Sequence, residues 1–196
     1  MTKQNQTGAE FTERYLRNAE LLSDKAKLDV DGHDACGVGL IAAIDGEPSR
    51  QVVEAGIEAL KALWHRGAID ADGMTGDGAG IMVEIPQDFF RDHVGRTGHT
   101  ASDGPIAVGM TFLPRTDLEE QEQCRYIAEA EILKFGYSIY GWRQVPIDLS
   151  ALGEKANATR PEIEQIMIEG PADSDLEKFE RDLFIIRKRI ENRARE

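Results

Sequence analysis

Cys36 is the residue whose type and neighbours point most directly to chemistry. It stands at the head of an apolar run and is followed by glycines at positions 37 and 39. A thiol is a weak nucleophile at its ordinary pKa, so it needs a base that removes its proton. Cys36 is therefore a candidate nucleophile. The alternative is a half-buried structural cysteine, because free cysteine also behaves as a small hydrophobic residue.

The chain can supply that base without a second side chain. Cleavage of the bond between Ala35 and Cys36 would make Cys36 the amino terminus and free its α-amino group. Such an amine has a pKa of about 8, so it accepts a proton close to neutral pH. The two glycines that follow would let other backbone approach the thiol closely. Ala35 and Cys36 are thus the expected processing site.

A strand and a helix are expected next to this cysteine. The apolar run over residues 36–44 predicts a strand that is buried on both faces. Apolar residues at helical spacing then predict a helix that starts after Ser49 and has Gly67 as its stop. Its inward face is formed by Val53, Ile57, Leu60 and Trp64.

Glycine-rich residues 75–80 lie between that helix and a second expected strand over residues 81–85. Phosphate-binding loops are similarly rich in glycine, but here the Gly-Lys-Ser/Thr ending is missing and a strand rather than a helix follows. The preferred interpretation is a tight connection that packs the second strand near the first.

The rest of the chain alternates between helical and strand patterns. Further helices are expected over residues 11–22, 87–94, 118–135 and 150–159, and strands over residues 106–113, 136–147, 163–168 and 183–187. Cys124, on the helix over residues 118–135, is expected in the core. The order of elements predicts a layered protein of the α/β or α+β class, and periodicity alone does not choose between them.

Five motifs, in one order and at one spacing, resemble the large subunits of glutamate synthases. They are Asp34 to Ala42, Leu60 to Ala68, Asp72 to Ile81, Gly141 to Pro146 and Arg160 to Gln165. The resemblance implies the class II glutamine amidotransferase domain of those enzymes. Its fold is that of the N-terminal-nucleophile (Ntn) hydrolases, of the α+β class, with a four-layer αββα sandwich that this chain would hold incompletely.

The resemblance also implies a domain organisation and a reaction. Residues 1–35 would be a propeptide, and residues 36–196 the amino-terminal part of the amidotransferase domain. L-glutamine would be hydrolysed to glutamate and ammonia, with the Cys36 thiolate attacking the side-chain amide and water clearing the thioester. In the family, ammonia assimilation is completed at a distant FMN site, where 2-oxoglutarate becomes glutamate.

That family chemistry sets the expected cofactors and partners. No cofactor is expected in this chain, whereas FMN and an iron–sulfur cluster are expected in the parent enzyme. The implied protein partners are the remaining synthase domains and a small reductase subunit.

Arg66 and Gly67 belong to the sequence His-Arg-Gly, which lies close to the nucleophile in class II amidotransferases. The resemblance implies that Arg66 shapes the substrate pocket around the thiol. On the residues alone, Arg66 is equally well explained as a cation favoured at the end of a helix, and Gly67 as the helix stop.

Part of the family's pocket has no counterpart in this sequence. The family takes oxyanion donors from an Asn-Gly pair, whereas none of the four asparagines here is followed by glycine. One such donor is worth about 2.7–4 kcal/mol of activation free energy, so the isolated chain is expected to hydrolyse glutamine poorly or not at all. We expect a piece of a longer polypeptide; the alternative is a non-catalytic interaction or assembly module on the same scaffold.

Composition sets further limits. The net charge of −13 over 196 residues argues against binding of nucleic acid. No apolar run is long enough to span a bilayer, and the first thirty residues lack the apolar stretch of a secretory signal. Two cysteines make no disulfide framework, so a reducing, cytoplasmic location is expected. The four histidines show no ligand spacing, and no metal site is expected.

Overall fold

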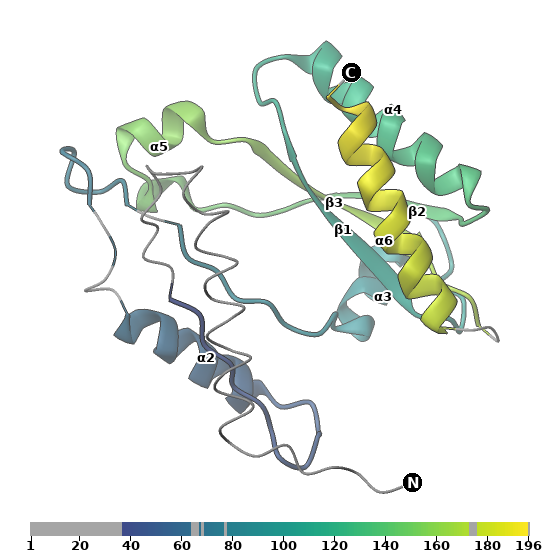
Figure 1. Ribbon diagram of the computed structural model, residues 1–196, viewed down its shortest axis with the longest axis horizontal. Coiled ribbons are helices and arrows are strands. Elements are labelled where there is room, and N and C mark those ends of the chain that lie inside the picture. Colours follow the sequence, from purple (N-terminus) through teal and green to yellow (C-terminus); the bar gives the residue numbers. More distant parts are fainter. Residues whose placement is uncertain (1–36, 64–66, 68, 77, 173–175, 196) are drawn as a thin grey trace, which may run out of the picture. The chain divides into compact units, whose positions relative to one another are not determined.

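The computed structural model (Figure 1) describes residues 37–63, 67, 69–76, 78–172 and 176–195. The chain divides into a unit of residues 1–40 and a unit of residues 41–196, and each is considered by itself. All helices and strands below belong to the second unit. The expected helix over residues 11–22 lies outside the described residues.

A three-stranded antiparallel sheet organises the second unit. Its strands are β1 (Ile106–Leu113), β2 (Ile139–Gln144) and β3 (Glu162–Glu169), in the order β1-β3-β2. β3 pairs with β1 over the full length of both strands and with β2 across a bulge near Gly141. The strands expected over residues 106–113 and 163–168 are confirmed, and the strand expected over residues 136–147 is confirmed in its central part.

Two helices, α4 (Leu118–Lys134) and α6 (Leu176–Arg193), cover one face of this sheet (Figure 1). The buried residues of this layer are Ala107, Ile132, Ile166, Ile168, Phe179 and Ile186. Asp117 caps the start of α4, and its carboxylate accepts a hydrogen bond of 2.9 Å from the amide of Glu120. Cys124, expected in the core, is half-buried.

The other face of the sheet is covered only in part among the described residues. α3 (Gln87–Arg96) packs Phe90 and Val94 there against a second group of buried residues, Ile106, Tyr140 and Met167. Side chains two residues apart on a strand share a face, so Met110 and Phe112 lie on this same face. They are 51% and 67% exposed. Half of an apolar sheet face is therefore open.

The expected strand over residues 183–187 is wrong, because this segment lies inside α6. Its apolar run suggests a strand when it is considered alone. In the longer sequence, Phe179, Leu183, Ile186 and Ile190 recur at three and four residues and all pack on the sheet. Helical spacing over eighteen residues decides the conformation of the shorter apolar run.

The two strands expected before the sheet, of which the first was expected to be buried, are not strands in this structure. Residues 37–44 and 81–85 have no assigned strand, and no described segment pairs with them. Val38 and Leu40 are more than nine-tenths exposed, where burial on both faces was expected. A strand exists only through the hydrogen bonds of a neighbour, and hydrophobicity alone does not supply that neighbour.

Helix α2 (Arg50–Ala62) confirms the helix expected after Ser49. The Ser49 hydroxyl accepts a hydrogen bond of 3.2 Å from the amide of Gln51 and caps the helix. The helix ends at Ala62 with Leu63 as its C-cap, so Gly67 is not its stop. Of its expected inward residues, Val53, Ile57 and Leu60 are half-buried and Trp64 lies outside the described residues; no residue of α2 is buried.

A short irregular region connects β2 to β3. The helix expected over residues 150–159 is divided into a 3-10 turn, η2 (Leu149–Ala151), and a helix, α5 (Glu154–Thr159). The division falls at Leu152 and Gly153, which have extended backbone. α5 thus lies in the connection between two adjacent strands of the sheet.

Candidate functional site

Of the four predicted site residues, the structure describes one. Ala35, Cys36 and Arg66 lie outside the described residues. Gly67 is described and exposed. The structure therefore does not test whether these residues come together. It does show how the chain is held immediately after Gly67.

Residues 69–76 form a small hairpin two residues beyond Gly67. Ile69 and Gly76 form an antiparallel bridge, and the amide of Asp70 donates a hydrogen bond of 2.7 Å to the carbonyl of Thr75. Gly73 occupies the turn with a φ of 69°, a conformation that glycine adopts without steric cost. The hairpin leads directly into the remaining residues of the glycine-rich segment.

Asp72 holds the turn of this hairpin together. Its Oδ1 accepts hydrogen bonds from the amides of Met74 and Thr75 at 3.0 and 2.7 Å. Its Oδ2 accepts the hydroxyl of Thr75 at 2.5 Å. The bond from the Thr75 hydroxyl, followed by those from the two amides, lowers the pKa of Asp72 to about 2. Asp72 is therefore ionised at neutral pH.

Helix α5 contacts the hairpin from 85 residues further along the chain. Lys155 Nζ donates to both carboxylate oxygens of Asp70, at 2.7 and 2.8 Å. The amide of Ala156 donates to the hydroxyl of Thr75 at 3.4 Å. Gly153, the N-cap of α5, is buried, and a Cβ atom there would overlap Thr75 Oγ1 and Asp72 Oδ2.

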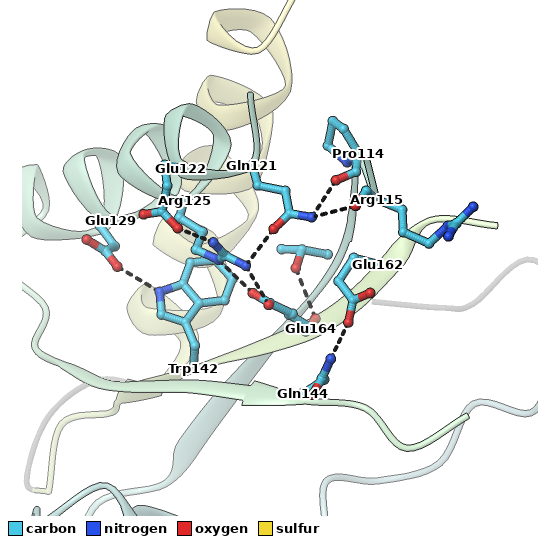
Figure 2. A network of polar contacts seen from close by, with 11 residues as sticks. Pro114, Arg115, Gln121, Glu122, Arg125, Glu129, Trp142, Gln144, Glu162 and Glu164 are labelled. Carbon is cyan, nitrogen blue, oxygen red and sulfur yellow. Dashed lines mark hydrogen bonds and ion pairs between the residues drawn. The ribbon is translucent and has the colours of Figure 1, made fainter. Parts of the chain in front are cut away.

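A second polar group ties α4 to β3 on the covered face of the sheet (Figure 2). Arg125 donates to both carboxylate oxygens of Glu164, at 2.8 and 2.6 Å, and to Gln121 at 3.2 Å. Its bond to Glu164 raises the pKa of Arg125 above its usual value. Trp142 donates to Glu129 at 2.7 Å. These groups already pair with one another, so we assign them to packing rather than to chemistry.

Arg143 forms a third group on the open face. Its Nε donates to Nε2 of His93 at 3.3 Å, and its Nη1 donates to Gln165 at 2.6 Å. The guanidinium lies 5.1 Å from the ring centre of Phe89. Burial, and then the charge of Arg143, lower the pKa of His93 below its usual value. Neutral His93 can accept the hydrogen bond that Arg143 offers.

Two open clefts lie elsewhere on the described surface. One, of about 450 Å³, lies at the ends of β2 and β3 and includes Gln144, Arg160 and Glu162. The other, of about 480 Å³, lies between residues 83–87, the start of β1 and α6. Gly67, the predicted site residue that the structure describes, lines neither cleft.

Two broader features of the described residues bear on the site. No group of three or more potential metal ligands among histidine, cysteine, aspartate and glutamate is found in the described part of the chain. None of the helices described is both long and apolar enough to cross a membrane.

Sequence reasoning missed the contact between the hairpin and α5. Asp72 lies in one of the five motifs, whereas Asp70, Gly153 and Lys155 lie in none of them. Charged residues on a loop and on a six-residue helix carry no periodic signal, and nothing local indicates that they meet. Gly153, between η2 and α5, was the one available hint, since an isolated glycine can mark close backbone approach.

Comparison with known proteins identifies the class to which this chain belongs. The family model for glutamine amidotransferases class-II matches residues 36–196. The chain belongs to the class II glutamine amidotransferase family.

The chain is also similar to individual proteins, which are glutamate synthases. It is 60% identical over 192 residues to the glutamate synthase [NADPH] large chain of Azospirillum brasilense, a match that covers 97% of this chain and 13% of the relative. It is 37% identical to the chloroplastic ferredoxin-dependent glutamate synthase of Spinacia oleracea and 36% identical to the glutamate synthase [NADPH] large chain of Bacillus subtilis. Each of these matches covers 82% of this chain and 10% of the relative. The chain thus spans about one eighth or less of the relatives' length.

Proposed function

We propose that this chain is the amino-terminal part of a glutamate synthase large chain and forms part of its glutaminase site. Cys36 is the nucleophile that attacks the side-chain amide of L-glutamine and releases ammonia. Its α-amino group, freed by removal of residues 1–35, accepts the thiol proton. Arg66 and Gly67 line the pocket around the sulfur.

The main support for this proposal is the position at which the family match begins. The class II family model starts at residue 36, which is the cysteine. This start supports a mature domain with Cys36 at its amino terminus. The match to the Azospirillum relative covers 97% of the chain and so includes most of residues 1–35, which supports a leader that is synthesised with the enzyme and then removed.

We also propose that the open sheet face becomes the inside of a four-layer αββα sandwich. Met110 and Phe112 leave half of this face exposed, and residues 37–44 and 81–85 are apolar segments without a paired neighbour among the described residues. These segments are the candidates for a second sheet that packs on the first. Further strands from the longer polypeptide would supply the hydrogen bonds that they lack.

The parent enzyme is proposed to use ammonia from this site to convert 2-oxoglutarate to glutamate. FMN and an iron–sulfur cluster belong to parts of the polypeptide outside this chain. The 60% identical relative is named as an NADPH enzyme, which favours NADPH as the electron source and a reductase subunit as a partner.

Glutamine hydrolysis by the longest polypeptide that carries this chain tests the proposal. We expect ammonia release with glutamine that falls at least a thousandfold in the variant Cys36→Ala. The variant Cys124→Ala is the matched control, because Cys124 is the other cysteine and its thiol is half-buried with a pKa raised by burial. Full glutamine hydrolysis by the Cys36→Ala variant would refute the proposed function and favour a non-catalytic module.

A further inference from the structure

The hairpin of residues 69–76 has little packing of its own to hold it in place. Its two large apolar side chains, Ile69 and Met74, are 67% and 57% exposed. Thr75 is its one half-buried residue, and the others are exposed. A segment without apolar burial is free to move unless polar contacts hold it. The contacts made by α5 are therefore the main restraint on this hairpin among the described residues.

α5 lies in a connection whose two ends are tied to the sheet. It lies between β2 and β3, and the amide of Val145 donates to the carbonyl of Ile163 at 3.0 Å just beyond the paired part of the strands. The connection therefore leaves and re-enters the sheet at adjacent positions. The two ends of the connection are thus fixed to the sheet, and α5 between them has no buried residue of its own.

The contact between α5 and the hairpin combines an ion pair with close packing. Lys155 donates to both carboxylate oxygens of Asp70, which fixes the start of the hairpin. Buried Gly153 lies where any side chain would overlap Thr75 Oγ1, so the end of the hairpin approaches α5 as closely as backbone permits. The hairpin is thus held at both of its strands.

We propose that α5 is a positioning element of the glutamine pocket, with Lys155 and Gly153 as its positioning residues. By holding residues 69–76, they fix the two ends that leave the hairpin: Gly67 on one side and glycine-rich residues 78–80 on the other. This inference rests on the proposed function, because Gly67 is a pocket residue only if the glutaminase assignment holds. Lys155 acts through Asp70 and does not touch the substrate.

We expect the loss of Lys155 to weaken glutamine binding without changing the folding stability of the chain. The Lys155–Asp70 pair is largely exposed, and such pairs add little to folding stability. A displaced pocket wall, in contrast, lowers the fraction of molecules that are ready to bind substrate. The apparent dissociation constant rises by the factor by which this fraction falls. Loss of Lys155 should therefore raise KM for glutamine more than it lowers kcat.

The first experiment measures the hairpin itself, by hydrogen exchange of residues 69–76 in the present chain. We expect the variant Lys155→Ala to exchange at least threefold faster there than wild type. Lys188→Ala is the matched control, because Lys188 is a similarly exposed lysine in an ion pair, with Glu191 on α6. Equal exchange in wild type and Lys155→Ala would overturn the inference.

The second experiment measures glutamine hydrolysis by the longest polypeptide that carries the chain. We expect a threefold to tenfold rise in KM for Lys155→Ala, with kcat within twofold of wild type, and recovery in Lys155→Arg. Gly153→Ala should raise KM further, whereas Gly56→Ala should not, because a Cβ at Gly56 meets no atom within 4 Å.

The outcomes separate this inference from the proposed function. Faster hairpin exchange in Lys155→Ala with an unchanged KM would overturn the positioning role and leave the glutaminase assignment intact. Absence of glutamine hydrolysis by the wild-type polypeptide would overturn the proposed function, and this inference with it.

Discussion

Residues 37–85 and residues 106–193 contain similar apolar runs, yet among the residues that the structure describes only those of the second region form a layered structure. Ile106–Leu113 and Glu162–Glu169 pair over eight residues and bury their side chains beneath two helices. Residues 37–44 and 81–85 are at least as apolar, and their side chains are largely exposed. An apolar run therefore specifies a strand only where a neighbouring strand is present.

The comparison also separates stability from chemistry. The residues with the greatest burial lie in the sheet and the helices packed on it, whereas the predicted site residues Cys36, Arg66 and Gly67 all lie before residue 82. Active sites need precise support, and in the arrangement that we propose this support comes from the hairpin of residues 69–76 and α5. The predictions below test this division, beginning with the largest expected effect.

Truncation of the core should destabilise the chain far more than truncation of the exposed run. Ile132→Ala removes a side chain that is 1% exposed, and we expect a loss of about 2–5 kcal/mol of unfolding free energy. Leu40→Ala, at 92% exposure, should change it by less than about 0.5 kcal/mol. Urea unfolding of the 196-residue chain measures both. Equal losses would contradict the division into two regions.

A substitution on the open sheet face should affect stability differently in the present chain and in the longer polypeptide. Phe112→Ser should alter the stability of the present chain by less than about 0.5 kcal/mol, because Phe112 is exposed. If a second sheet covers it, the same change in the longer polypeptide should cost about 3 kcal/mol or more. Phe184→Ser, on α6, is the control and should have a small effect in both. A small effect of Phe112→Ser in both would refute the four-layer arrangement.

Glu131 provides a test of the polar core between α4 and α6. This fully buried carboxylate accepts hydrogen bonds from Lys134, Arg189 and Arg193 at 2.6 to 2.7 Å. The bond from Lys134, followed by that from Arg189, lowers its pKa to about 2. Glu131→Gln would leave buried polar atoms facing cations, at a cost of about 1–3 kcal/mol in urea unfolding. Glu129→Gln, on the same helix, is a less buried control.

The pKa of Glu131 also predicts how this region responds to acid. Because the folded pKa lies below that of the unfolded chain, the stabilisation is complete above the unfolded value of about 4.5 and declines as the pH falls toward 2. Wild type should therefore lose stability between about pH 5 and pH 2, and Glu131→Gln should lose less over that range. Parallel pH profiles for the two proteins would contradict the proposed role of Glu131.

The smallest expected effect concerns His93 on the open face. Its pKa is lowered by burial and then by Arg143, so protonation disfavours the folded contact and stability should rise as the pH increases toward 6.5. NMR titration should show His93 titrating below 6.5, and Arg143→Met should move its pKa partway back. An unchanged titration in Arg143→Met would show that burial alone sets this pKa.

Sequence alone predicted the elements whose signals are local. Ser49 indicated the start of α2, short apolar segments located β1 and β3, and inward apolar residues located α4. The segment over residues 183–187 was misassigned because a short apolar run fits both conformations. The strands before residue 86 were overpredicted because their expected neighbours are set by long-range pairing, which periodicity does not encode.

The candidate site was predictable only through its motifs. Cys36, Arg66 and Gly67 were selected because their neighbours form a recognisable pattern. Lys155 was not, since its partner Asp70 is 85 residues away and neither residue belongs to a periodic face. Contacts of this kind depend on the folded connection between β2 and β3, so they become visible only in three dimensions.

Mass spectrometry of the mature amino terminus tests the central claim most directly. The longest polypeptide that carries this chain is purified and treated with a glutamine-like electrophile. We predict that its first residue is Cys36 and that the label is bound to the Cys36 sulfur, while Cys124 stays unlabelled. An amino terminus at Met1, or a Cys36 that is exposed by cleavage and fails to react, would contradict the account.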